Sequence, residues 1–219
     1  MKKNMYSLIL AEDVVNEIDR LAETEGTNRS NLINQILAEY VSVTTPEKRI
    51  SDVFRNIESL MQSAENELPV FFANHDNTLS IKSALAYRYR PTIRYEVELY
   101  RVPKGTIGEL KVNFRTQSSE LLASLTEFFR LWRNMEDIYV APFFKDNGID
   151  YALEEGKWTR SLCLPKDTEY ASDALGRAIS DYVKTFDRLL KKYLAGEYKN
   201  ARRLENDYLA ALNGGMLMI

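Results

Sequence analysis

Cysteine and histidine are almost absent from this sequence, and their scarcity excludes several kinds of site. Cys163 is the only cysteine and His75 the only histidine among 219 residues. One thiol allows no intramolecular disulfide, and one thiol with one imidazole provides no zinc or nickel cluster of the usual ligand spacing. We therefore expect no metal, no cofactor and a reducing compartment. His75 and its neighbour Asp76 are interpreted as an ordinary loop pair.

Long apolar runs and catalytic loop motifs are also missing. No uncharged apolar run approaches the roughly 18 residues that a membrane-spanning helix needs. Lys2 and Lys3 could begin a signal peptide, but Glu12 and Asp13 interrupt the short apolar segment that follows them. Neither a glycine-rich phosphate loop nor a Gly-x-Ser-x-Gly elbow occurs, which disfavours an enzyme. We expect a cytoplasmic protein with no catalytic activity and no membrane partner.

Positive charge is in short supply as well. The chain has a net charge of −3 and contains 45% hydrophobic residues, which is enough for a folded core. Residues 1–49 carry six Lys or Arg against eight Asp or Glu, a net charge of −2. Phosphate neutralisation provides most non-specific affinity for nucleic acids, so this balance argues against DNA binding unless the basic residues are well placed.

The first 45 residues have the pattern of one strand followed by two helices. Residues 5–10 are short, apolar and rich in strand-forming side chains, and acidic residues suited to the first turn of a helix follow. Apolar residues then recur at helical spacing until Gly26, where a left-handed residue would end the helix. Asn28 can cap a second amphipathic helix that continues to Val41. The short strand cannot pair with itself, and the two helices have too little surface to close a core alone, which favours dimerisation.

This pattern resembles the ribbon-helix-helix DNA-binding family of MetJ, Arc and CopG type. The resemblance covers residues 3–44 and rests on 8–15, 18–22 and 26–33. In that family, one strand from each protomer pairs antiparallel with the other and enters the major groove. The resemblance thus implies that Tyr6, Leu8 and Leu10 face the dimer core. The DNA-binding residues that it implies are Lys3, Asn4, Met5, Ser7 and Ile9 on or before the strand, and Asn28, Arg29 and Ser30 as a phosphate anchor.

The remaining sequence predicts a second, larger domain. Thr45 and Pro46 are typical of a helix start, and residues 46–68 are interpreted as a linking helix. This helix either joins the two domains, where it could also pair with its dimer mate, or packs on its own domain. Alternation between residues 78 and 117 predicts antiparallel strands with one wet face. A helix from Ser118, a strand over 158–164 and helices over 172–194 and 198–212 follow. The predicted fold class is therefore α+β, with an N-terminal ribbon-helix-helix (1–45) and a C-terminal effector or oligomerisation domain (69–219).

A basic and aromatic stretch inside the predicted sheet is the candidate surface of the second domain. Residues 88–115 carry seven Lys or Arg against three Glu, a net charge of +4. Arg88, Arg90 and Arg94 could bind an anionic ligand or a partner, because guanidinium groups suit both. The alternative, which the alternation favours, is a wet sheet face that carries long charged side chains.

Together these features predict a homodimeric, sequence-specific transcriptional regulator of bacterial type. Its expected partners are double-stranded DNA, a second copy or a higher even oligomer, and an unidentified small ligand. Family analogy favours a repressor. One alternative is an accessory DNA-binding protein of a plasmid or conjugative element, acting in transfer, partition or antitoxin regulation without sensing a ligand.

Overall fold

The computed structural model describes residues 5–62, 70–72, 77–85, 91–145, 148–154 and 156–219. The chain is α+β and divides into two compact units, residues 1–49 and residues 50–219. Helices α1 (Glu12–Thr24) and α2 (Arg29–Tyr40) belong to the first unit, and helix α3 (Pro46–Met61) begins at the boundary. Thr45 caps α3 by accepting a hydrogen bond from the Lys48 N–H at 3.1 Å, as its place before Pro46 predicts.

No strand precedes the amino-terminal helices, so the predicted ribbon-helix-helix order is wrong. Residues 5–11 form no regular secondary structure, and the first helix begins directly after them at Glu12. A strand exists only through hydrogen bonds to a neighbouring strand, and none of the described strands pairs with this segment. Strand-forming side chains alone therefore did not produce a strand here.

An antiparallel sheet forms one layer of the second unit. Its six strands lie in the order β1-β2-β3-β4-β6-β5, and every neighbouring pair is antiparallel. Long β3 and β4 form a hairpin through Gly105, whose φ of +85° suits a glycine turn. The strand bounds are β1 (Val70–Phe72), β2 (Thr78–Ala84), β3 (Thr92–Lys104), β4 (Thr106–Phe114), β5 (Tyr151–Glu154) and β6 (Lys157–Cys163).

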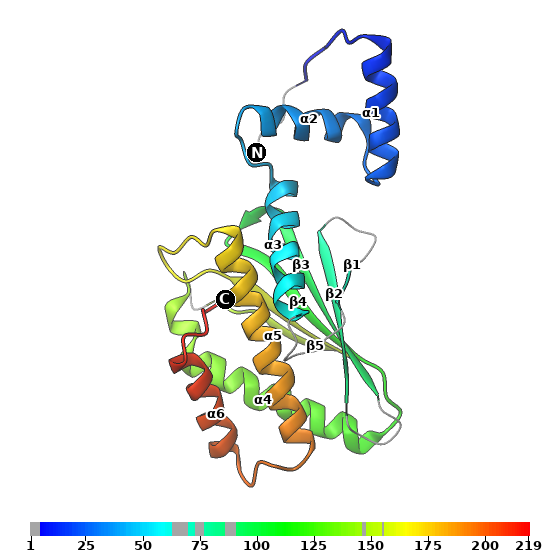
Figure 1. Cartoon of the computed structure of the whole chain (residues 1–219). Helices are drawn as coiled ribbons and strands as arrows, with labels where there is room; N and C mark the ends of the chain where they lie inside the picture. The colour runs from blue at the N-terminus through cyan, green and yellow to red at the C-terminus, as the bar shows by residue number, and fades with distance from the viewer. Residues whose placement is uncertain (1–4, 63–69, 73–76, 86–90, 146–147, 155) are drawn as a thin grey trace. The chain divides into compact units, whose positions relative to one another are not determined.

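Helices cover one face of this sheet (Figure 1). Helices α4 (Ser119–Tyr139) and α5 (Ser172–Leu194) lie across it, α3 packs beside α5, and α6 (Ala201–Asn213) follows a short loop; a 3-10 turn spans Ala141–Phe143. The Asn56 side chain and the Val53 main chain of α3 come so close to Gly176 of α5 that a Cβ there would lie 2.8 Å from Asn56. Of the two predicted roles for this helix, packing on its own domain is therefore observed from Ile50 onward.

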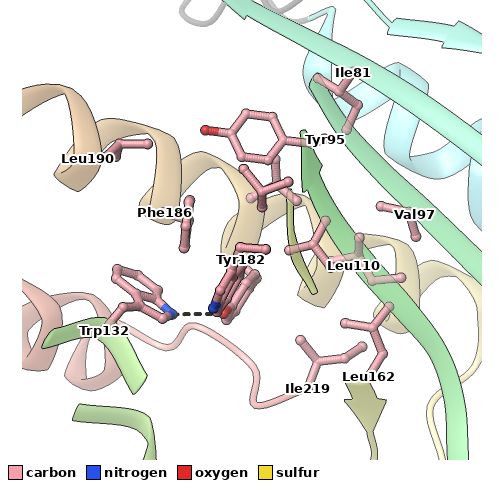
Figure 2. Close-up of a cluster of buried hydrophobic side chains, with 14 of the residues drawn as sticks. Ile81, Tyr95, Val97, Leu110, Trp132, Leu162, Tyr182, Phe186, Leu190 and Ile219 are labelled. Carbon is pink, nitrogen blue, oxygen red and sulfur yellow. Dashed lines mark hydrogen bonds between the residues drawn. The ribbon is translucent and has the colours of Figure 1, made fainter. Parts of the chain in front are cut away.

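Aromatic side chains fill the space between the helices and the sheet (Figure 2). Phe186 of α5 lies at the centre, within 5.2 Å of the Trp158 ring and 4.7 Å of the Trp132 ring between centroids. Tyr95 on β3 meets the Phe186 ring edge-on and donates a hydrogen bond to Asp187 at 2.9 Å. Burial, followed by the Asp187 charge, raises the pKa of Tyr95 well above its ordinary value, so this phenol stays a donor. The core thus joins α4, α5, β3 and β6 into one unit.

One ion pair is enclosed completely within this core. The Arg160 guanidinium on β6 contacts the Glu136 carboxylate on α4 at 2.8 Å, and both side chains are 0% exposed. Tyr151 and Tyr182 donate hydrogen bonds to Glu136 at 3.0 and 3.1 Å, and Trp132 donates to the Tyr182 oxygen. Burial is the largest influence and opposes the charged form of Arg160, but the Glu136 carboxylate together with Tyr182 and Tyr151 outweighs it and raises the pKa of the guanidinium. The guanidinium therefore stays charged at every ordinary pH.

We expect the substitution Arg160→Met to destabilise the chain by about 3–5 kcal/mol, because Glu136 would remain buried without its counter-charge. Urea unfolding followed by far-ultraviolet circular dichroism would measure the loss. Arg130→Met is the matched control, because Arg130 lies on α4 and also pairs with a glutamate, Glu127, but its side chain is 60% exposed. Its urea midpoint should stay close to that of the parent chain. Similar midpoints for both variants would contradict a structural role for the enclosed pair.

Candidate nucleic-acid interface

The amino-terminal unit is a pair of amphipathic helices joined by a tight turn. Gly26 follows α1 with a φ of +65°, so the predicted left-handed glycine is confirmed. The Asn28 side chain accepts a hydrogen bond from the Asn31 N–H at 3.0 Å, which confirms the predicted cap of α2. Local signals in the sequence therefore place both helices correctly.

This unit has very little core of its own. Among its described residues, only Ala22, Leu32 and Thr45 are buried. Apolar side chains of both helices and of the flanking segments remain exposed: Val14, Ile36, Leu37, Tyr40, Val41 and Val43, together with Met5, Tyr6, Leu8, Ile9 and Leu10. An apolar surface of this extent on so small a unit is typical of an interface.

The two sets of side chains predicted to alternate between core and DNA are both exposed. Met5 and Ile9 are 97% and 103% exposed, while Tyr6 and Leu8 on the expected core side are 82% and 60% exposed. The assignment of faces depended on a strand, and residues 5–11 form none. Ser7 is also exposed, and among the three residues predicted to face the groove, Met5, Ser7 and Ile9, it is the one whose side chain can hydrogen-bond a base edge. The other two predicted contacts, Lys3 and Asn4, lie outside the described residues.

The predicted phosphate anchor at the start of α2 is partly engaged by the protein itself. Asn28 uses its carbonyl oxygen as the helix cap. The Arg29 Nε donates to Asp19 Oδ1 of α1 at 2.6 Å, and a second guanidinium nitrogen donates to Oδ2. This double hydrogen bond lowers the pKa of Asp19 and holds α1 against α2. Ser30 stays exposed. Arg29 is half exposed, so a phosphate can still approach it, but Asp19 offsets its charge.

The candidate surface of the second unit falls only partly on described residues. Arg88 and Arg90 lie outside them. Arg94 lies on the sheet face opposite the helices, 52% exposed and 3.6 Å from Glu96 of the same strand. Its neighbours across the sheet are Lys82 and Asn113. Arg94 therefore belongs to a basic row at one end of a wet sheet face.

An acidic row occupies the other end of the same face. Glu98 and Glu109 are register partners on β3 and β4, and Lys111 contacts them at 2.6 and 3.7 Å. Partial burial and the hydrogen bond with Glu109 raise the pKa of Tyr100 to about 12. These charges largely satisfy one another, as expected for a solvated sheet face, which is the alternative that the alternation favours.

The sequence interpretation overlooked a set of basic residues in the second unit. Arg188 on α5, Lys199 in the following loop and Arg202 and Arg203 at the start of α6 are exposed. A count of charges along the sequence would have found them, because residues 184–203 carry seven Lys or Arg against two Asp or Glu.

In the described part of the chain, no three His, Cys, Asp or Glu side chains are grouped so that they could hold a metal ion. None of its helices is long and apolar enough to cross a membrane. Comparison of the sequence with family models and curated proteins, and of the structure with solved structures, gave no match. The resemblance of residues 3–44 to ribbon-helix-helix proteins therefore stays an untested prediction from the sequence, and the strand-helix-helix order that it implied is not observed in the described residues.

Proposed function

We propose that this chain is a cytoplasmic, homodimeric DNA-binding transcriptional regulator that uses its amino-terminal unit both to dimerise and to contact DNA. The observation that carries the proposal is the missing core of that unit, where only three described residues are buried. Units this small bury too little surface to be more than marginally stable alone, and a disulfide, a metal or a partner commonly supplies the remaining stability. Residues 1–49 contain neither cysteine nor histidine, which leaves a partner.

A second copy is the partner that fits best. Large apolar side chains are exposed on α2 and on the chain after it, namely Ile36, Leu37, Tyr40, Val41 and Val43, which suits association with an identical apolar surface across a two-fold axis. A symmetric pair of helical units would present two copies of Ser7 and Arg29 to DNA, and paired contacts suit a two-fold symmetric site. Binding across a promoter is enough to block transcription, so a repressor is the simplest form of this regulator.

The segment that precedes α1 is the proposed reader of base edges. Its side chains are exposed and its backbone forms no described secondary structure, so it can follow a groove without first breaking other contacts. Ser7 would hydrogen-bond a base, and the apolar side chain of Ile9 would meet a thymine methyl group. The α2 start, with Arg29 and Ser30, would hold the adjoining phosphate.

Replacing Leu37 by Glu is expected to weaken the dimer, because a charge would enter the apolar interface. Sedimentation equilibrium of the full chain should show the dissociation constant rising by roughly tenfold or more. Ile138→Glu provides the control, since Ile138 is a 60% exposed apolar residue near the end of α4. It should leave dimerisation unchanged. A parent chain that is monomeric at every concentration would remove the basis of the proposal.

Arg29 and Asp19 should have opposite effects on DNA binding. Arg29→Ala removes a cation from the phosphate anchor and is expected to weaken binding to all duplexes, with a salt slope smaller by about one unit. Asp19→Asn removes the offsetting anion and should strengthen binding. Fluorescence anisotropy over a range of salt concentrations measures both. If both variants weaken binding equally, the pair serves only to hold α1 on α2.

Selection of bound duplexes from random DNA tests base reading directly. The parent chain should select a two-fold symmetric site, because the proposed dimer carries two readers. Ser7→Ala should change the selected bases, while Arg29→Ala should keep the same bases at lower affinity. If the parent chain and Ser7→Ala enrich the same bases to the same extent, Ser7 takes no part in base reading.

A further inference from the structure

A basic surface with little internal compensation lies where α5 ends and α6 begins. It consists of Arg188, Lys199, Arg202 and Arg203, which are all exposed and are called the α5–α6 basic surface below. None of these four side chains forms an ion pair with another described residue, in contrast to Arg20, Arg29 and Arg130 elsewhere. Residues 184–203 have a net charge of +5 in a chain whose net charge is −3.

The packing of α6 on α5 holds these cations together. Leu204 and Tyr208 of α6 are buried in the core of the second unit. Asp207 accepts a hydrogen bond from Tyr198 at 2.9 Å and contacts Lys192 of α5 at 3.2 Å. Arg188 lies one helical turn before Lys192, and Arg203 one turn before Asp207, so both cations flank this contact from their own helices. The short loop between α5 and α6 therefore keeps the four basic residues of this surface together on one side of the second unit.

The neighbouring acids are already occupied. The hydrogen bond from Tyr198, together with Lys192 and the nearby charge of Arg188, lowers the pKa of Asp207, so this anion is bound to Tyr198 and Lys192 and offsets Arg188 in part. Glu205 accepts a hydrogen bond from Tyr139 at 2.7 Å. Asp187 is buried and is bound by Lys191 and Tyr95, so the Glu197 carboxylate in the loop is the remaining acid of residues 184–203. One carboxylate against four exposed cations leaves most of the positive charge available to an external anion.

The chemistry of the surface favours the sugar-phosphate backbone of a nucleic acid over a lipid membrane. Peripheral membrane sites combine cations with exposed apolar side chains that enter the acyl region. No large apolar side chain between residues 184 and 203 is exposed. Guanidinium and ammonium groups without an apolar anchor are the groups that contact nucleic-acid phosphates.

We infer that the α5–α6 basic surface binds the phosphate backbone of the DNA that the amino-terminal unit recognises. This inference rests on the proposed function and supplies what that function lacks. Residues 1–49 have a net charge of −2, and Asp19 offsets Arg29, so the unit that reads the bases provides little phosphate neutralisation. The second unit provides the non-specific affinity, and the first provides the sequence preference.

The test compares two full-chain variants that change the net charge equally. The surface variant replaces all four residues of the α5–α6 basic surface by Gln. The control variant replaces four exposed basic residues of the same unit that lie outside this surface, namely Lys104, Arg115, Lys145 and Lys166. Binding to a random-sequence duplex is measured by anisotropy from low to high salt, and urea midpoints verify that both variants fold.

The surface variant is expected to bind the random duplex roughly tenfold or more weakly at low salt, with a salt slope smaller by about 2 to 4 units. The control variant should keep most of the affinity and slope. Equal losses in the two variants, or no loss in the surface variant, would overturn the inference while DNA binding by the chain stands. Absence of binding by the parent chain would instead overturn the proposed function together with the inference. If the parent chain binds phosphatidylserine vesicles but no duplex, the inference is overturned, because the partner of this surface would be a membrane and not DNA.

Discussion

The enclosed pair of Glu136 and Arg160 is the interaction on which the second unit depends. It joins α4 to β6, while Tyr151, Tyr182 and Trp132 extend the same network to β5 and α5. Arg160 also donates to the main-chain oxygens of Ser161 and Ile219, which brings the segment after α6 into the core. A buried ion pair adds little net stability compared with apolar packing, but it tolerates no other arrangement of these elements, because any displacement would leave a charge without a partner. The pair therefore fixes how the helices lie on the sheet.

Local signals in the sequence were sufficient to predict most of the elements. Alternation at Ile93, Tyr95 and Val97 identified β3, and Asn28, Gly26 and Thr45 marked helix ends that the structure shows where they were expected. These signals act within a few residues, so the sequence carries them directly. Strand β5 was missed because its four residues form a strand only through pairing with β6.

Local signals in the sequence did not predict two features: that residues 5–10 form no strand, and that Glu136 and Arg160 form an enclosed pair. Residues 5–10 have the composition of a strand, yet a strand is a property of two segments, and the described chain pairs nothing with them. Glu136 and Arg160 are 24 residues apart and appear in the sequence as ordinary surface charges. Only the fold brings them together. The candidate site divides in the same way: the exposure of Ser7 and Arg29 fits expectation, whereas the Asp19 contact to Arg29 required the packing of α1 on α2.

The two units differ in where their stability comes from, and this difference bears on their roles. The second unit has a continuous core and an internal charge network, so it can fold without help and present charges such as those of Arg188 and Arg203 in a fixed arrangement. The described part of the first unit has almost no core, so little apolar burial within that unit stabilises its two helices. A protein that recognises a sequence gains from this division. On the proposed function, the second unit would hold DNA phosphates of any sequence, while the first unit would become fully ordered only where its partner and the bases both fit, and the coupling of folding to binding would then limit tight contact to the correct site.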